Sequence, residues 1–189
     1  MTTPTLAISA PFPVSGEYVL DPNHTRISFV ARHAMVTRVR GYFHEFSGVA
    51  HIDAQDPSRS HAQVTIKAAS VDTGNEQRDA HLRSNDFFDM TAFPEITFTS
   101  TAVGRVDGTH FTLTGDLTIK GTTRPVTLDL EFTGASVDPY GGQRLGFEGS
   151  VVVNRKDWGV SWNAVLEGGG ALVSNKVTLE LAPVTVWRS

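Results

Sequence analysis

The chain has no cysteine, no run of basic residues and no long apolar segment, and each absence excludes a class of protein. Without cysteine among its 189 residues, it has no disulfide bonds, thiolate metal ligands or cysteine nucleophile. No segment approaches the roughly 18 apolar residues of a membrane-spanning helix, so we do not expect an integral membrane protein. The net charge of −4, without a basic cluster, argues against nucleic acid as a partner, because binding phosphates requires concentrated positive charge.

Signals for catalysis and for metal binding are also missing. The sequence has no G-x-S-x-G motif, and its histidines never fall in H-x-H or H-x-x-x-H spacing. His44, His51 and His61 belong to separate segments of the chain. We therefore predict no catalytic residue, no metal site and no cofactor other than a bound ligand.

The N-terminal stretch lacks the features of a secretory signal peptide. No Lys or Arg precedes Arg26, and three prolines interrupt the weakly apolar segment. We expect residues 1–15 to form a flexible arm and residues 16–189 to form a single domain, since this length suits one sizeable core. We also expect the protein to be cytoplasmic.

What the sequence does have is a repeated alternation of apolar and polar residues. In residues 111–119, Phe111, Leu113 and Leu117 alternate with threonines and an aspartate, as expected for a strand with one apolar face. About eight such strands in succession favour an all-β, lipocalin-like, up-and-down antiparallel barrel or a sandwich. Many of these strands are long, which favours a tall closed barrel. A closed barrel also leaves no strand edge exposed. The segments are 26–33, 42–53, 64–68, 96–102, 111–119, 126–132, 145–153 and 177–181.

The face that points into this barrel mixes large and small residues. The small ones could simply alternate with large ones to fill a tapering core, or they could leave a cavity, and the pattern alone does not decide. No charged residue lies on this face in the middle of a strand, so a cavity would hold an apolar molecule by contact area. Burying about 400 Å² contributes about 10 kcal/mol before the costs of binding. The predicted lining consists of Ile27, Phe29, Ala31, Ile66, Ala68, Phe87, Phe88, Phe98, Ser100, Leu113, Gly115, Leu117, Leu130, Phe132, Phe147, Gly149, Val151 and Trp162.

The one helical segment lies between two strands. Thr73 and Glu76 have the spacing of a capping box, which predicts a short helix from about Thr73 to Asn85 or Asp86. Asp86 would then cap a second short turn.

Helical spacing also decides which charged side chains of this segment can meet. Asp79 and His81 are two residues apart and point in different directions, so they do not form a dyad, whereas Asp79 and Arg83 are placed for a surface ion pair. Arg78 and His81 share a face and are candidates for binding a polar head group. His33, at the end of its strand, is a third candidate, or else a histidine satisfied by a backbone carbonyl.

Near the C-terminus, the segment Asn154-Arg155-Lys156-Asp157-Trp158-Gly159 interrupts the alternation of its strand. We expect a structural corner here, rather than a site. Trp158 is expected to plug one end of the barrel.

Several motifs, in order and across nearly the whole chain, resemble the YceI-like family of lipocalin-like, polyisoprenoid-binding bacterial proteins. The resemblance extends from about Gly16 to Leu181. The motifs that carry it are Asp21-x-x-His24, Arg78-Asp79-x-His81-Leu82, Asp86-Phe87-Phe88-Asp89, Gly115-x-Leu117-Thr118-Ile119-x-Gly121 and Asn154-Arg155.

This resemblance implies an elongated barrel of eight antiparallel strands with a hydrophobic tunnel. The tunnel would take a polyisoprenoid or, as in relatives, a fatty acid or quinone, and the barrel would often form a homodimer. Many relatives carry a signal peptide, which is not visible here. Two alternatives to lipid carriage stay open: an enzyme that acts on such a lipid through His33 or His81, and a stress-response module that binds a protein partner.

Overall fold

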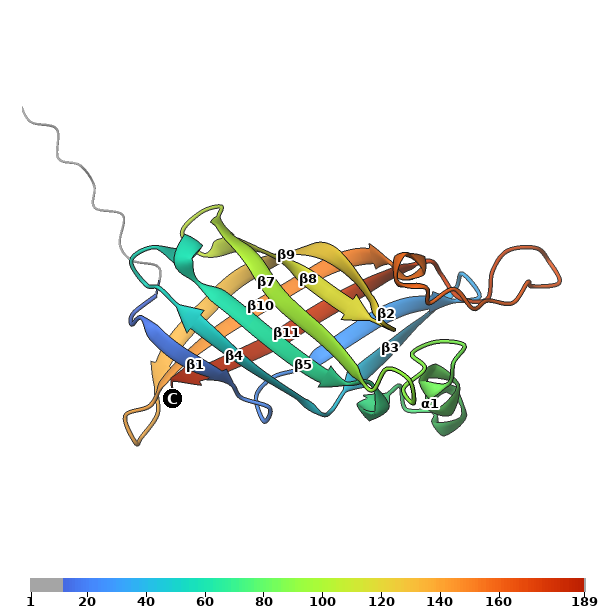
Figure 1. Cartoon of the computed structure of the whole chain (residues 1–189), viewed down its shortest axis with the longest axis horizontal. Helices are drawn as coiled ribbons and strands as arrows, with labels where there is room; N and C mark the ends of the chain where they lie inside the picture. The colour runs from blue at the N-terminus through green and yellow to red at the C-terminus, as the bar shows by residue number, and fades with distance from the viewer. Residues whose placement is uncertain (1–11, 189) are drawn as a thin grey trace, which may run out of the picture.

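An antiparallel β-barrel accounts for most of the computed structural model, which describes residues 12–188 (Figure 1). The apolar side chains that alternate along each strand point into the barrel, as the period of two predicts. The strands are β1 (Gly16–Leu20), β2 (Ile27–His33), β3 (Thr37–Phe43), β4 (Phe46–Ile52), β5 (His61–Lys67), β6 (Val71–Asp72), β7 (Glu95–Arg105), β8 (His110–Ile119), β9 (Thr122–Val137), β10 (Gln143–Asn154) and β11 (Lys176–Arg188).

These strands fill eight positions around the barrel. β1 and β2 share one position, because both pair with β11, through Tyr18↔Arg188 and Ile27↔Leu181. β3 and β4 share the next position, and β5 with the two-residue β6 makes the third. β7 to β11 complete the ring in chain order. The predicted eight-stranded antiparallel barrel is therefore confirmed, with its first three strands interrupted.

The barrel is elongated, and its two ends differ (Figure 1). One end carries helix α1 (Glu76–Arg83), the β2–β3 hairpin and residues 159–175. We call this the helix end. The opposite end carries the β7–β8 and β9–β10 turns and the last residues of β11. No helix within residues 12–188 is long and apolar enough to cross a membrane.

Helix α1 begins later and ends earlier than its sequence predicts. Its N-cap is Asn75, whose side chain accepts a hydrogen bond from the backbone N–H of Arg78 at 2.9 Å. Thr73 instead donates its hydroxyl to the buried carboxylate of Asp79 at 2.5 Å. The capping box was therefore wrong: Gly74, at φ +75°, turns the chain between Thr73 and the helix, which leaves Asn75 as the cap. The helix ends at Arg83, and Asp86 caps no further turn.

The expected N-terminal arm is held against the barrel in the part that the structure describes. Phe12 is buried at the opposite end, where its ring lies 5.2 Å from those of Phe111 and Phe132. Ser15 accepts a hydrogen bond from the Ala54 backbone N–H at 2.8 Å. Residues 12–15 are thus packed, not free, because Phe12 fills the end of the apolar interior. Residues 1–11 lie outside the described residues.

Candidate functional site

The interior of the barrel contains a cavity of about 320 Å³ with an almost wholly apolar wall. Its lining runs from Phe12 and Ile52 near the opposite end to Leu82 and Phe88 at the helix end. The volume falls at the lower end of the range of small-molecule pockets, roughly 300–1,000 Å³. Of the two readings of the inward face, the hollow barrel is the one found. Such a space accepts a long, narrow, apolar ligand.

Most of the predicted lining residues do border this cavity. Every strand position of the barrel contributes to the wall, since inward residues alternate along each strand. The predicted residues that line it are Ile27, Phe29, Ala31, Ile66, Phe87, Phe88, Phe98, Leu113, Leu117, Leu130, Phe147 and Val151.

Two predicted lining residues, Gly115 and Gly149, do not face open space. A Cβ atom on Gly115 would lie 2.4 Å from Cζ of Phe98, and one on Gly149 would lie 2.3 Å from Cδ2 of Leu130. The large side chain of the neighbouring strand occupies the place of the missing one. Glycine here lets a ring or a leucine lie flat against the sheet, which keeps it out of the centre of the barrel.

The other predicted lining residues that miss the cavity have local reasons. Ala68 is buried in a 3₁₀ turn after β5. Ser100 lies at an irregularity in the β7–β8 pairing and accepts a hydrogen bond from the Ala62 backbone N–H at 2.8 Å. Phe132 packs edge-on against Phe12. Trp162 packs against His81 with ring centroids 4.5 Å apart.

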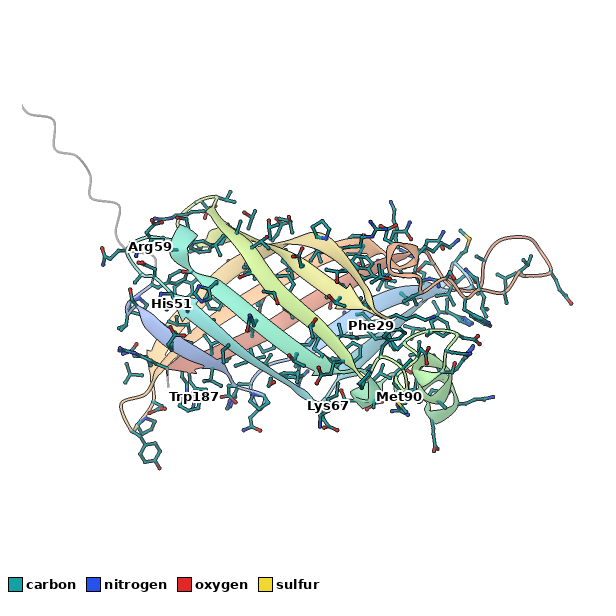
Figure 2. All side chains as sticks on the ribbon, in the orientation of Figure 1. Phe29, His51, Arg59, Lys67, Met90 and Trp187 are labelled. Carbon is teal, nitrogen blue, oxygen red and sulfur yellow. The ribbon has the colours of Figure 1, made fainter. Side chains whose placement is uncertain are left out.

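The helix end of the cavity is covered by α1 and the turn that follows it. Leu82, Phe87 and Phe88 all line the space. Phe88 lies edge-on to Phe43, at 5.8 Å, and to Phe29, at 6.4 Å between ring centroids. Figure 2 labels Phe29 and Met90 close to α1 at this end, with His51 and Arg59 far away toward the other. The helical segment and the turn after it therefore supply an apolar cover for this end of the cavity.

The three head-group candidates do not reach the cavity. His33 is exposed, and its backbone forms an isolated antiparallel β-bridge with Val173. Arg78 donates from Nε to the hydroxyl of Thr73 at 2.7 Å and from Nη2 to the Thr73 carbonyl at 2.9 Å. His81 shares a hydrogen bond of 2.8 Å between Nε2 and Oδ2 of Asp86. None of the three side chains lines the cavity.

The charged pairs of the helical segment also differ from the prediction. Asp79 and Arg83 form no ion pair: Arg83 donates to the carbonyls of Ala69 and Val71, both at 2.8 Å. An Asp–His pair does exist, between His81 and Asp86, because the chain turns back after Arg83 and brings Asp86 alongside. Spacing within a helix cannot reveal such a pair.

One charged residue on the cavity wall was not predicted as part of a site. Arg155 is buried and lines the cavity at the helix end. Its guanidinium donates to three backbone carbonyls, those of Ser174, Val160 and Val173, at 2.9, 2.7 and 3.4 Å. Burial lowers the pKa of Arg155, yet an arginine stays protonated in proteins. A positive charge without a carboxylate on its guanidinium therefore lies beside an apolar space.

Trp158 helps to close the same end. Its indole is buried, lines the cavity and donates from Nε1 to the Leu117 carbonyl at 2.8 Å. The predicted corner is thus present, as a 3₁₀ turn at Arg155–Trp158. Arg155 shows that the corner also contributes to the cavity wall.

A buried carboxylate, Asp21, lies outside the cavity, at the break between β1 and β2. Its Oδ2 is 2.8 Å from Nδ1 of His24 and 2.6 Å from Nη1 of Arg144, and Oδ1 accepts from the Asn23 N–H at 3.0 Å. Burial alone would raise the pKa of Asp21, but these hydrogen bonds outweigh it, and the pKa lies below its ordinary value. These hydrogen bonds hold the break between β1 and β2 against Arg144 of β10. Neither Asp21 nor its partners line the cavity.

Within residues 12–188, no group of three or more acidic or histidine side chains is placed to hold a metal ion. His51 and His61 stack with ring centroids 5.2 Å apart, and Nδ1 of His51 lies 2.5 Å from Oε1 of Glu17. What the described residues do form inside the barrel is an apolar cavity.

The sequence of this chain is similar to those of known proteins. The family model described as "YceI-like domain" matches residues 18–184. The protein named YceI of Shigella flexneri is 39% identical over 162 residues, which cover 85% of this chain and 84% of that protein. Its counterpart in Escherichia coli O157:H7 is 38% identical over the same coverage.

Solved structures share the barrel. BcnA of Burkholderia cenocepacia superposes with a TM-score of 0.76 at 25% identity, covering 88% of this chain and 98% of that one. A structure described as a polyisoprenoid binding domain from Saccharophagus degradans gives a TM-score of 0.67 over 91% and 98% of the two chains. At 17% identity, the latter likeness is one of fold alone.

Proposed function

The chain belongs to the YceI-like domain family, and from this premise we propose that it binds a long-chain amphiphilic lipid inside the barrel, for carriage or storage. The ligand class is a polyisoprenoid, an isoprenoid quinone or a fatty acid. The observation that carries the proposal is the apolar cavity of about 320 Å³ that follows the barrel interior. The description of the Saccharophagus degradans neighbour as polyisoprenoid-binding supports the isoprenoid member of this class.

The wall chemistry supports recognition by contact area. Apolar surface contributes about 25 cal/mol per Å² when it leaves water, so an alkyl or prenyl chain is held without specific polar contacts. Arg155 would favour a head group that is anionic or accepts hydrogen bonds at the helix end of the cavity. No catalytic step belongs to the proposal, since nothing in the family's binding-protein fold gives positive evidence of one.

The proposal is tested by titrating delipidated protein with geranylgeraniol and following the fluorescence of Trp158, which lines the cavity. Trp162 and Trp187 are replaced by phenylalanine, so that Trp158 is the remaining indole. We expect a saturable change at stoichiometric ligand, because the prenyl chain comes into contact with the indole, which lines the cavity. A strictly linear, non-saturating response would contradict lipid binding in this cavity.

A further inference from the structure

The outer surface of the helix end combines exposed apolar side chains with basic ones. We propose that this surface docks the barrel on an anionic lipid bilayer, with the apolar side chains inserted among the head groups. The proposal concerns the outside of the barrel, and so it is independent of what the cavity holds.

The apolar part consists of Met35, Val36 and Val165, which we call the apolar tip. Their exposed fractions are 70%, 81% and 87%. The first two lie at the turn of the β2–β3 hairpin and the third lies in residues 159–175, the loop that projects farthest at this end (Figure 1). The two segments are joined: the Ala34 N–H donates to the Leu172 carbonyl at 2.7 Å. The apolar tip is therefore one surface made by two segments.

The backbone of the hairpin turn that carries Met35 and Val36 is strained. Ala34 and Met35 both have positive φ, +49° and +61°, and the Val36 N–H donates to the His33 carbonyl at 3.1 Å, so they are the central residues of a β-turn with the φ signs of type I′, within a three-residue loop between the paired His33 and Thr37. Asn-Gly is the usual occupant of such a turn, because other residues are strained at positive φ. Asn-Gly would be both more polar and less strained here. Backbone strain kept at an exposed position is a pointer to function.

The basic part lies directly behind the apolar tip. A groove on the outer face of β2, β3, β10 and β11 includes Met35 and carries Arg32, Arg38, Arg40 and Lys176. Among the described residues that line it, Glu180 is the only carboxylate, and it pairs with Arg40. The protein as a whole has a net charge of −4, so this concentration of cations runs against the overall charge. Its complement is a surface of anionic head groups.

The position of this surface fits loading or release of a lipid. Ala31 and Val173 line both the outer groove and the interior cavity, so only the wall of the barrel separates the two spaces at this point. The opposite end also has exposed apolar residues, Tyr140 and Val137, but Asp138 lies between them. The loop of Val165 also carries the exposed Glu167, so the preference of the helix end for an anionic bilayer rests on the basic groove of Arg32, Arg38, Arg40 and Lys176, and not on a contrast in charge between the two ends.

The test is sedimentation with vesicles of phosphatidylglycerol and phosphatidylcholine, compared with vesicles of phosphatidylcholine alone. We expect binding to the anionic vesicles that weakens as salt is added. The variant R32Q/R38Q should bind roughly 25-fold more weakly, at about fivefold for each basic residue near the surface. Met35→Asn should also weaken binding while keeping the turn, because asparagine tolerates positive φ.

Two controls keep the outcomes distinct. Tyr140→Asn removes the most exposed aromatic residue at the opposite end and should leave vesicle binding unchanged. Leu113→Trp, inside the cavity, should bind vesicles like the parent even where lipid uptake is lost, so that failure of the carriage proposal and failure of docking are separable. No binding to anionic vesicles, or equal losses for Tyr140→Asn and Met35→Asn, would overturn the proposal. A parent dimer that Met35→Asn converts to monomer, without vesicle binding, would also overturn it and assign the surface to a second copy.

Discussion

At the scale of single residues, Asp21 links pH to stability. Its pKa is lowered in the folded protein, so the stabilisation that it contributes is fully present above the unfolded-state value near pH 4 and is lost as the pH falls through the folded value. Other acids share this direction, among them Asp107, whose pKa is lowered to about 2 by the backbone N–H groups of Thr109 and His110. The fold should therefore weaken in acid well below neutral pH.

Replacing Asp21 by asparagine tests this linkage. We expect the free energy of unfolding at pH 7 to fall by about 2 kcal/mol, because charge-assisted hydrogen bonds to His24 and Arg144 are lost. The difference from the parent should shrink near pH 3, below the ordinary pKa of an aspartate, because the stabilisation from a lowered carboxyl pKa is lost as the pH falls toward the folded-state value. Urea denaturation at the two pH values measures both effects, with exposed Asp129→Asn on β9 as the control. An equal loss at both pH values would exclude the ionised carboxylate as the cause.

The sequence did not identify the residues of the site equally well. Apolar lining residues such as Leu113 and Phe98 were predicted, because a period of two assigns them a side of the sheet. Arg155 was expected to serve only a structural corner, since the chain places it after a strand and nothing local reveals that the cavity ends there. His33, Arg78 and His81 were chosen for their chemistry, but none of them lines the cavity, and Arg78 and His81 form hydrogen bonds with Thr73 and Asp86.

At the scale of elements, glycines opposite large residues keep the cavity open. Phe29 on β2 pairs with Gly41 on β3, and a Cβ on Gly41 would lie 2.3 Å from Cζ of Phe29. Leu130 on β9 pairs with Gly149 on β10 in the same way, and its side chain occupies the place of the missing Cβ. One of the two interpretations left open by the sequence was that small inward residues leave a cavity at their own positions. In fact the space is created one strand away, where the large side chain lies flat.

Gly41→Ala should therefore act on binding more than on folding. The atoms nearest to the added methyl group belong to the far end of the Phe29 ring, so we expect the ring to move toward the interior and occupy ligand space. We expect weaker uptake of geranylgeraniol, by roughly tenfold if about 1.4 kcal/mol of contact is lost. The measurement is the Trp158 titration.

The double variant G41A/F29L and a matched glycine give the controls. Removing the ring should restore uptake toward the parent value. Gly108→Ala, where a Cβ meets nothing within 4 Å, should leave uptake unchanged. Uptake that Gly41→Ala does not reduce would show that Phe29 has room to move without entering the cavity.

At the scale of the whole molecule, the barrel was predictable and its interruptions were not. Eight alternating segments and their turns predict the strand count, because each strand buries one face. The chain breaks after β1 and after β3 leave the apolar pattern almost intact. They become visible only in the strand pairing, where β1 and β2 both pair with β11, and β3 pairs with β2. Whether the interior is filled or hollow also depends on the whole, since it is set by how side chains from opposite walls meet.

Mass spectrometry of denatured extracts of the purified protein tests the central claim most directly. The claim is that the apolar cavity holds a lipid chain. We predict a stoichiometric isoprenoid or fatty acyl species from the parent, and much less from Leu113→Trp, whose larger side chain occupies the cavity. Thr114→Trp, which adds the same ring to the polar face of β8, should retain the lipid. A parent protein that carries no lipid, and takes up none after delipidation, would contradict the account.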